Sequence, residues 1–347
     1  MSSRIAINGR FLRQRVTGVQ RYAREVTRRL PGQVELIAPG VGAQGFAGHL
    51  WEQLILPRRA GKEALLWCPA NSGPLSASRL VLTMHDISPL VHPEWYGARY
   101  AAWYAFLAPR LAHKALRVLT DSEFSRQEML QALRLDGERV LVVPCGVDRQ
   151  QFFRRDEGEI ESVRRRYALD KPYLLAVGTL SPRKNRDMLL RVWQDKFARS
   201  QEIELVLVGG RSRALRKTDL GELPPGVRVA GYVADGDLPA LYSGALALVE
   251  PSLYEGFGLP ILEAMACGTP VIASRAGGLP EAAGEAGLLV ETGDPQALGD
   301  ALTKLLEDGA LREELRLRGL ARAESLSWEK AAERVWRILQ RVASDGG

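Results

Sequence analysis

The sequence predicts an α/β protein with two Rossmann-like, doubly wound parallel-sheet domains. Short apolar runs of strand length alternate with helical stretches along all 347 residues, and both halves of the chain share this rhythm. Strands that alternate with helices form parallel sheets covered on both faces. A chain of this length also exceeds one ordinary hydrophobic core, so two domains are expected.

Composition narrows the class of protein. The chain is 46% hydrophobic and 25% charged, which is typical of globular proteins, and no apolar run approaches the roughly 20 residues that cross a bilayer. The N-terminal MSSRIAIN enters a strand without a signal-peptide core, and three widely spaced cysteines disfavour a disulfide framework or a zinc site. A cytoplasmic protein is expected. The net charge of +6 favours anionic partners: nucleotide, lipid headgroups or nucleic acid.

The first strand is RIAIN, and an amphipathic helix follows it. The segment between them lacks the G-x-G-x-x-G fingerprint, which disfavours a nicotinamide enzyme. Residues 1–30 hold eight arginines and one acid, Glu25. This surplus fits either a solvated helix face or a surface for an anionic acceptor or membrane.

Five further apolar runs predict strands in the first half: VELIA, LLWC, RLVLTM, RVLTDS and VLVVP. The loops 69–75 and 85–96 follow two of these strands, and α/β proteins place their sites at such carboxyl ends. A lone histidine is usually structural, but His85 at a strand tip is a candidate site residue. Ser122, or alternatively Asp121, is expected to cap the helix after RVLTD.

The helical stretch at 99–117 mixes aromatic and basic side chains. The aromatic residues are Trp103, Tyr104 and Phe106, and the basic ones are Arg99, Arg110 and Lys114. This mixture suits a membrane interface, and it equally suits a core helix with a charged back, which is the preferred interpretation.

In the second half, the strand YLLAV ends before Gly178, and Arg183 and Lys184 precede a helix whose expected N-cap is Asn185. Two cations at a strand tip can neutralise a diphosphate leaving group. By spacing alone, an ordinary surface charge pair explains them equally well.

Residues 247–274 predict strand, loop, helix and strand. Pro260 suits the first helical turn, and Gly268 suits the helix end. The loop residues Gly256, Phe257, Gly258 and Leu259 aim the free N–H groups of the helix start at a seat for phosphate. Glu255 and Glu263 flank this seat and are expected to bind hydroxyl groups, although a solvated loop residue and a helix-dipole residue explain them too.

The order P-S-x-x-E-G-F-G-L-P-x-x-E-A-M-A-C-G-T-P-V-I-A-S resembles the signature of retaining glycosyltransferases of family 4, which have the GT-B fold. The resemblance implies that Glu255 contacts the donor sugar and Glu263 the nucleotide ribose. It places His85 against the donor sugar and Gly18, in T-G-V-Q-R-Y, near the donor phosphate. The order G-T-L-x-x-R-K-N assigns Arg183 and Lys184 to the donor phosphates. Tyr232 and Val233 correspond to the edge of the nucleobase.

The resemblance also implies a GT-B domain organisation, with two Rossmann-like domains facing across a cleft. Residues 1–168 form the acceptor-side domain, 169–327 the nucleotide-sugar domain, and 328–347 a helix that returns to the first domain.

The implied activity is transfer of a hexose from a nucleoside diphosphate sugar to an acceptor hydroxyl. T-G-V-Q-R-Y, P-A-N-S-G-P-L and H-D-I-S-P-L-x-H-P-E-W look most like bacterial mannosyltransferases of lipid-linked oligosaccharide assembly. The expected donor is therefore GDP-mannose and the expected acceptor a saccharide, lipid-linked in this interpretation. The alternatives are UDP-glucose or another nucleotide sugar, and a nucleotide-sugar epimerase.

Three expectations concern other partners. No D-x-D metal motif is apparent, so no metal and no cofactor besides the donor are expected. Peripheral association with the inner face of an anionic cytoplasmic membrane is expected from the basic first domain. Nucleic-acid binding is not expected, because no basic module interleaved with aromatic residues is present.

Overall fold

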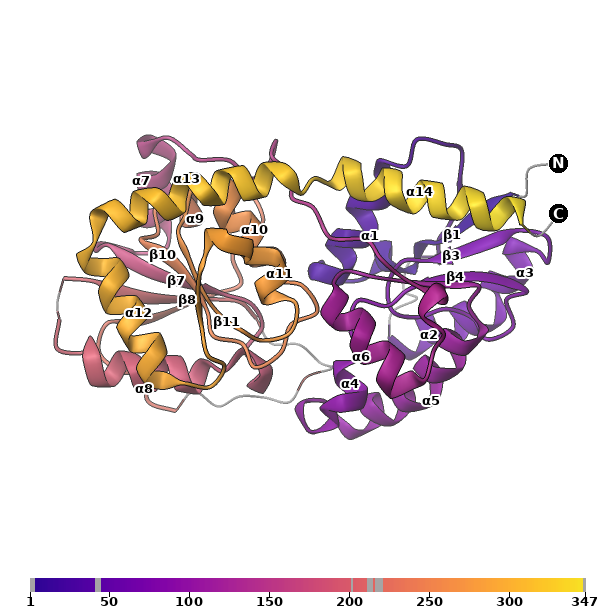
Figure 1. The fold of residues 1–347 in the computed structure, drawn as a ribbon, viewed down its shortest axis with the longest axis horizontal. Helices are drawn as coiled ribbons and strands as arrows, with labels where there is room; N and C mark the ends of the chain where they lie inside the picture. The colour runs from indigo at the N-terminus through magenta and orange to yellow at the C-terminus, as the bar shows by residue number, and fades with distance from the viewer. Residues whose placement is uncertain (1–3, 41–44, 201, 211–214, 216–220, 346–347) are drawn as a thin grey trace. The chain divides into compact units, whose positions relative to one another are not determined.

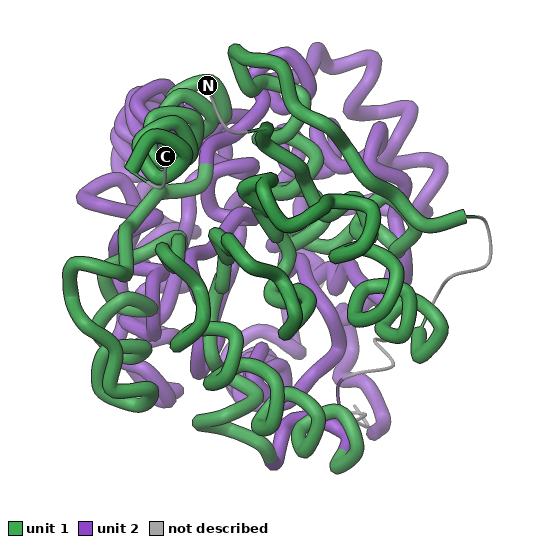
Figure 2. The backbone as a smooth tube through the Cα atoms, turned by 90° about the vertical axis from the view of Figure 1, so that its right-hand side faces the viewer, with its two compact units in different colours: residues 1–93, 98–145, 328–347 green, residues 94–97, 146–327 purple. Residues whose placement is uncertain are grey.

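Figure 1 shows the chain in a computed structural model, which describes residues 4–40, 45–200, 202–210, 215 and 221–345. The chain forms two compact units, coloured separately in Figure 2. Unit 1 comprises Met1–Pro93, Ala98–Cys145 and Trp328–Gly347, and unit 2 comprises Glu94–Gly97 and Gly146–Ser327.

Unit 1 contains a parallel six-stranded sheet in the order β2-β1-β3-β4-β5-β6. Its strands are β1 (Ile5–Asn8), β2 (Glu35–Ile37), β3 (Leu65–Cys68), β4 (Arg79–Thr83), β5 (Arg117–Thr120) and β6 (Val140–Val142). Every strand predicted in this half is present. All residues of β1 and β3 are buried, as expected for a sheet covered on both faces.

The helices of unit 1 cover this sheet. They are η1 (Gly9–Arg13), α1 (Gly18–Arg28), α2 (Gly45–Leu54), α3 (Leu56–Ala60), α4 (Ser88–Val91), α5 (Ala98–Lys114), α6 (Glu123–Leu133), η3 (Gly137–Arg139) and α14 (Trp328–Ser344). The short η2 (Pro93–Trp95) runs from unit 1 into the segment grouped with unit 2. α5 buries Tyr104, Leu107 and Leu111 in the core, so the preferred interpretation of this stretch as a core helix is confirmed.

The C-terminal helix α14 packs within unit 1. Trp328 is 1% exposed, and its ring centroid lies 5.9 Å from that of Tyr22 on α1. Arg79 at the start of β4 donates to the carbonyl oxygens of Val342 and Ala343 near the other end of α14. These contacts tie both ends of the helix to the first half of the chain.

Unit 2 contains a second parallel six-stranded sheet, in the order β12-β11-β10-β7-β8-β9. Its strands are β7 (Tyr173–Val177), β8 (Glu204–Val208), β9 (Val227–Gly231), β10 (Ala247–Glu250), β11 (Val271–Ser274) and β12 (Leu288–Val290). Its helices are α7 (Glu157–Arg166), η4 (Pro182–Lys184), α8 (Arg186–Lys196), α9 (Leu238–Ser243), α10 (Leu259–Ala266), α11 (Leu279–Ala283), η5 (Gly284–Ala286), α12 (Pro295–Glu307) and α13 (Gly309–Ser325).

The two units divide between Cys145 and Gly146, whereas the sequence placed the boundary after residue 168. The difference comes from α7, which packs against α9 of unit 2. Tyr167, at the end of α7, donates to Asp237 at the start of α9 over 2.9 Å. The stretch 146–168 therefore belongs to the second core.

Glycines bring the loops of unit 2 together at the carboxyl edge of its sheet. Gly178 follows β7 at φ +137°, and Gly209 follows β8 at φ +145°. A Cβ atom on Gly209 would lie 1.7 Å from the carbonyl oxygen of Gly178. Only glycine adopts this conformation readily, and only glycine leaves room for so close a contact between the two backbones. The two loops therefore meet without a side chain between them.

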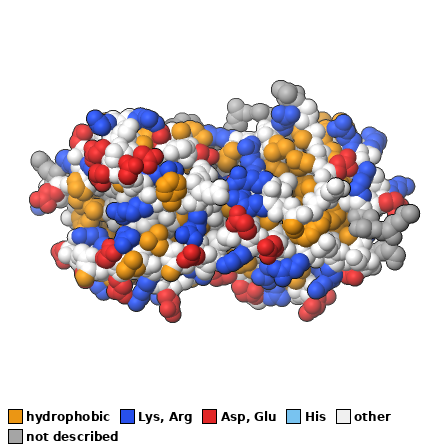
Figure 3. Space-filling view, turned by 90° about the horizontal axis from the view of Figure 1, so that it is seen from above, with side chains coloured by type: hydrophobic (Ala, Val, Ile, Leu, Met, Phe, Trp, Pro, Cys, Tyr) orange, Lys and Arg blue, Asp and Glu red, His pale blue; other side chains and the backbone are white. Residues whose placement is uncertain are grey.

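The basic residues do not form one band on the face drawn in Figure 3. There, Lys and Arg side chains are interleaved with acidic and apolar ones. Within the described residues, no helix is long and apolar enough to cross a membrane.

Candidate functional site

Arg183 and Lys184 lie on the short helix η4, at the carboxyl edge of the second sheet between β7 and α8. Asn185 occupies the N-cap position of α8, as predicted, but in a left-handed conformation and without a side-chain capping bond. The side chain of Lys184 is 5% exposed and that of Arg183 is 19% exposed. Burial of this degree excludes an ordinary surface charge pair.

Both cations contact carboxylates at the end of β10 or in the loop after it. Lys184 Nζ lies 2.8 Å from Glu255 Oε1 and 3.0 Å from Glu250 Oε2. Arg183 Nη1 lies 3.0 Å from Glu255 Oε2. Ser252 Oγ donates to Glu250 Oε1 over 2.6 Å and to Glu255 Oε1 over 3.2 Å. Glu250 and Ser252 thus belong to a network in which the sequence had identified Arg183, Lys184 and Glu255.

The charges of this network shift the pKa of Glu255. Burial alone would raise that pKa, but Arg183 and Lys184 outweigh burial and lower it to about 2. A third cation, Arg186, is 1% exposed and donates to the carbonyl oxygen of Val177 over 3.0 Å. Burial lowers the pKa of Arg186, while Glu250 and Glu255 oppose that shift. Three basic and two acidic side chains therefore share one buried region.

Neighbouring loops hold the network in place. The backbone N–H of Leu253 donates to the carbonyl oxygen of Arg183 over 2.7 Å, and the backbone N–H of Gly278 donates to the backbone carbonyl oxygen of Glu255 over 2.8 Å. A Cβ atom on Gly178 would lie 2.6 Å from Cε of Lys184. One on Gly277 would lie 2.2 Å from the carbonyl oxygen of Glu255. Side chains at these glycines would displace the functional groups.

The loop before α10 begins the helix as predicted. Gly258 is the N-cap at φ +117°, Pro260 lies in the first turn, and Gly268 follows the helix at φ +73°. Phe257 is buried beside Gly256, and Leu259 opens the helix.

The two predicted glutamates are both buried. Glu255 is 8% exposed and Glu263 is 6% exposed. Tyr242 of α9 donates to Glu263 Oε2 over 3.1 Å. These values exclude a solvated loop residue at Glu255. Glu263 does more than interact favourably with the helix dipole, because its buried carboxylate accepts a hydrogen bond from Tyr242.

Two other predicted residues of unit 2 lie between β9 and α9. Tyr232 is 58% exposed, whereas Val233 is 3% exposed. Gly18 lies in unit 1, where it opens α1 behind the N-cap Thr17.

His85 lies after β4 in unit 1 and is 6% exposed. Its Nδ1 lies 2.6 Å from Asp121 Oδ2, and its Nε2 lies 3.1 Å from the carbonyl oxygen of Pro69. Both neighbours are acceptors, so the geometry suits a doubly protonated ring. Burial lowers the pKa of His85, but the contacts with Asp121 and Pro69 together raise it by more, so the net shift is upward. Ser122, not Asp121, caps α6, and it accepts from the Ser125 N–H.

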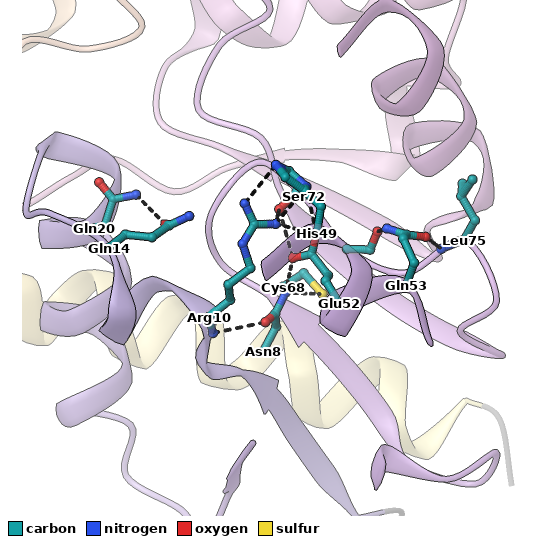
Figure 4. Close-up of polar contacts among 11 residues, drawn as sticks. Asn8, Arg10, Gln14, Gln20, His49, Glu52, Gln53, Cys68, Ser72 and Leu75 are labelled. Atoms are coloured by element: carbon teal, nitrogen blue, oxygen red, sulfur yellow. Dashed lines mark hydrogen bonds and ion pairs between the residues drawn. The ribbon is translucent and has the colours of Figure 1, made fainter. Parts of the chain in front are cut away.

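A second cluster, drawn in Figure 4, lies where β1 and β3 of unit 1 end. We call it the Arg10 cluster. At its centre the side chains of Arg10 and Glu52 point toward one another, 2.7 Å apart between Nη1 and Oε2. Its members are Asn8, Arg10, His49, Glu52 and Ser72.

Glu52 is fully buried and receives three donors. Asn8 Nδ2 donates to Oε1 over 2.7 Å, Ser72 Oγ donates to the same oxygen over 2.9 Å, and Arg10 donates to Oε2. His49 lies 3.0 Å from Arg10 Nη1, and burial together with this cation lowers the pKa of His49 to about 4. The ring of Trp103 meets His49 edge-on at 5.7 Å between centroids. A neutral imidazole, a cation and an aromatic wall together suit sugar hydroxyl groups.

Sequence reasoning missed most of this cluster. Arg10 lies two residues after the end of the first strand, and Ser72 lies in the 69–75 loop, so their place at the sheet edge was predictable. Nothing in the sequence marked His49 and Glu52, which lie on a helix of ordinary composition.

One tripeptide corrects the expectation that no D-x-D motif is present. Asp235, Gly236 and Asp237 have this spacing. Asp237, however, contacts Arg166 and Tyr167 at the start of α9. In the described part of the chain, no three His, Cys, Asp or Glu side chains are grouped to hold a metal ion.

Comparisons with known proteins agree on one family. A family model described as "Glycosyl transferases group 1" matches residues 171–308, and "Glycosyltransferase Family 4" matches residues 63–151. The chain is 36% identical over 291 residues to O-antigen chain mannosyltransferase B of Escherichia coli, which covers 80% of this chain and 76% of that protein. This chain is a family 4 glycosyltransferase.

More distant likenesses support the same fold. The serotype-specific mannosyltransferase WbdA of Escherichia coli is 28% identical over 282 residues, 76% of this glycosyltransferase and 33% of that longer protein. Sucrose-phosphate synthase of Thermosynechococcus elongatus superposes with a TM-score of 0.76 at 22% identity, over 99% of this chain and 100% of that one. The predicted fold class, GT-B with two parallel-sheet domains, is confirmed.

Proposed function

We propose that this glycosyltransferase transfers mannose from GDP-mannose to a hydroxyl group of a lipid-linked saccharide, with retention of the anomeric configuration. The observation that supports mannose as the transferred sugar is the 36% identity to O-antigen chain mannosyltransferase B over most of both chains. The name of that relative gives it as a mannosyltransferase of the O-antigen chain, which supports a saccharide acceptor.

The donor diphosphate is assigned to Arg183 and Lys184. With Arg186, these basic residues outnumber the carboxylates of Glu250 and Glu255. The network therefore has an excess of positive charge, which favours the binding of an anion. Preorganised cations stabilise charge that develops on a leaving group, which is commonly the largest single contribution to catalysis. In this proposal the departing diphosphate takes the acceptor proton as the sugar bonds to the acceptor oxygen on the same face.

The remaining roles are assigned residue by residue as part of the same proposal. Glu255 is assigned to donor-sugar hydroxyls, Glu263 to the ribose, and the 232–233 turn to the base. His85, at the sheet edge of unit 1, is assigned to the donor sugar. The Arg10 cluster, at the same edge, is assigned to the acceptor saccharide. No divalent cation is needed, because the cations and the start of α10 supply the positive charge.

The experiment starts with thermal shifts of the full chain in GDP, UDP, ADP and dTDP. A ligand that binds only the folded state raises its stability by mass action, so GDP should give the largest shift. Transfer from GDP-mannose to octyl α-D-mannopyranoside is then followed in excess EDTA. Transfer from UDP-glucose in place of GDP-mannose would replace the donor assignment. Turnover of the donor without any acceptor would favour a hydrolase or an epimerase. Loss of transfer in EDTA, restored by Mg²⁺, would refute the metal-free mechanism.

A further inference from the structure

Asp121 and His85 form a buried pair at the carboxyl edge of the first sheet, outside the Arg10 cluster. Asp121 does not cap α6, because the side chain of Ser122 accepts the capping bond. Instead, Asp121 is 4% exposed and places its Oδ2 atom 2.6 Å from Nδ1 of His85. A buried carboxylate is costly without a partner, so the function of Asp121 is to be sought at the His85 ring.

His85 links the ends of three neighbouring strands. β4 lies between β3 and β5 in the sheet. His85 comes after β4, while Pro69 directly follows β3 and Asp121 directly follows β5. The ring bridges the two outer strand ends, since Nδ1 faces Asp121 and Nε2 lies 3.1 Å from the carbonyl oxygen of Pro69. One side chain therefore ties the loop after β3 to the strands beside it.

This loop, residues 69–75, connects the ring with the Arg10 cluster. On the ring side, Asn71 Oδ1 accepts from the backbone N–H of His85 over 2.7 Å. On the cluster side, Ser72 Oγ donates to Glu52 Oε1 over 2.9 Å (Figure 4). A displacement of the loop at the ring would therefore move a donor of the buried carboxylate at the centre of the cluster.

The contacts of the ring require a proton on both of its nitrogens. The carboxylate of Asp121 and the carbonyl oxygen of Pro69 are acceptors, and a neutral imidazole has a single N–H. Loss of one proton would turn a nitrogen lone pair toward one of the two oxygens. The buried ring in these contacts is therefore an imidazolium.

The other titratable groups around the pair agree with this charge state. Burial lowers the pKa of His85, but Asp121 and the nearby Asp86, together with the hydrogen-bonded carbonyl, raise it above its ordinary value. The ring of Tyr22 on α1 meets His85 edge-on at 4.7 Å, and Cys145 after β6 lies beside Asp121. Burial and the carboxylate raise the pKa of both the phenol and the thiol, so both stay neutral.

From this arrangement, we propose that Asp121 is a positioning residue, which holds His85 as a doubly protonated link and thereby fixes loop 69–75 for the acceptor saccharide. The inference rests on the proposed function in one respect, the assignment of the Arg10 cluster to the acceptor. A contact between the ring and the donor sugar would require the Nε2 proton to leave Pro69, so the two roles of His85 predict different kinetics.

The inference has a direct consequence for pH. The folded protein raises the pKa of His85, so the link is complete below the ordinary histidine pKa of about 6.5 and is lost as pH rises through the raised value. The carboxylate of Asp121 keeps the Nδ1 proton, so the contact with Pro69 is the one that breaks. The loop is then released from the ring.

The test is hydrogen exchange of the full chain, measured by mass spectrometry without donor or acceptor on both sides of this pH range. Protection of the amides of loop 69–75, relative to an unstructured chain at the same pH, should fall at least tenfold as pH rises. Protection of β8 in unit 2 should stay constant. This measurement on the wild type requires no variant to fold.

Two variants test the part played by the carboxylate. In Asp121→Asn, the loss of loop protection should occur at lower pH, because the charge that favours the imidazolium is absent. Glu138→Gln, at an exposed acid of unit 1 on η3, is the matched control and should keep the parental pH dependence.

Steady-state transfer gives a second measurement. In Asp121→Asn at neutral pH, the KM for octyl α-D-mannopyranoside should rise at least fivefold, while the KM for GDP-mannose stays unchanged. A loss of stability alone would lower the amount of active enzyme and leave both KM values as they are.

Three results would overturn the proposal. The first is loop protection in the wild type that does not depend on pH. The second is a parental pH dependence in Asp121→Asn. The third is a raised KM for GDP-mannose with an unchanged KM for the acceptor, which would assign the ring to the donor sugar alone. A pH-dependent loop in a chain that transfers no mannose would refute the proposed function and leave the link between Asp121, His85 and the loop standing.

Discussion

Lys184 Nζ lies 2.8 Å from Glu255 Oε1, although 71 positions separate the two residues in the sequence. Lys184 is 4% exposed and Glu255 is 8% exposed, so water screens their attraction little. Buried ion pairs contribute little to stability compared with apolar packing, and breaking one by removing a single partner is costly. Buried charges of this kind add little stability, and here they lie at the carboxyl edge of a parallel sheet. Together, these two facts strongly indicate a functional site.

Replacing Arg183 with Ala should weaken binding of GDP more than it destabilises the fold. The change removes a charge-assisted contact of roughly 1.5–3 kcal/mol, which corresponds to an affinity loss of about 10- to 150-fold. Calorimetric titration of GDP measures the loss. Lys196→Ala, which breaks an exposed ion pair with Asp300, is the control and should bind like the wild type. Parental affinity in Arg183→Ala would contradict the phosphate assignment.

Lys184→Ala should behave differently from Arg183→Ala. Besides losing the proposed contact with the donor, it leaves Glu250 and Glu255 without a shared cation in a buried region. Unfolding in urea should therefore show a loss of roughly 3–5 kcal/mol. A stability equal to that of Arg183→Ala would mean that Lys184 is not the central cation.

Gly178→Ala should impair the site by displacing Lys184. Its φ of +137° disfavours any side chain, and its Cβ atom would lie 2.6 Å from Lys184 Cε. The backbone strain alone costs roughly 1–3 kcal/mol. The transfer rate should fall, while Gly236→Ala, where a Cβ atom meets nothing within 4 Å, should retain the parental rate. Equal rates for both variants would show that Lys184 need not occupy this position.

Glu255→Gln should change the acid stability of the protein. The pKa of Glu255 is depressed to about 2 in the folded state, compared with about 4.3 in an unfolded chain. Its stabilisation is therefore complete above pH ~4.3 and is lost as pH falls toward ~2. The free energy of unfolding should decline less steeply across this range in Glu255→Gln than in the wild type. Glu285→Gln, at an exposed position, should keep the parental slope.

The two glutamates of the site should also differ in function. Glu255→Gln removes a negative charge beside two cations, so GDP should bind at least as tightly while kcat falls. Glu263→Gln keeps the shape of the side chain but weakens an acceptor assigned to the ribose, so GDP affinity should fall. Calorimetry beside steady-state transfer separates the two cases. The opposite pattern would reverse the assignments.

Much of this fold could be predicted from the sequence, because its signals are local. Apolar runs marked the strands, Pro260 and Gly268 marked the ends of α10, and Ser122 marked the start of α6. The same reasoning placed Arg183, Lys184 and Glu255 at strand tips, where parallel topology brings loops to one edge.

What the sequence could not predict depends on contacts between distant segments. Glu250 ends an apolar strand and resembles any strand-terminal residue until Lys184 is placed beside it. Glu52 has the sequence context of an exposed helix residue, yet it is the one charge that α2 buries. The D-x-D spacing at 235–237 is an example of a sequence motif whose expected role the contacts do not support. Its Asp237 side chain contacts Arg166 and Tyr167.

The most direct test of the proposed function is the transfer of radiolabelled mannose from GDP-mannose to octyl α-D-mannopyranoside, in excess EDTA, by the wild type, Arg183→Ala and Glu52→Gln. We predict a labelled disaccharide product with the wild type and a large loss of rate with Arg183→Ala. With Glu52→Gln, we predict a rise of at least tenfold in the KM for the acceptor, an unchanged KM for GDP-mannose, and parental behaviour in the control Glu63→Gln. No labelled product with the wild type, or a product formed equally well by Arg183→Ala, would contradict the proposed function.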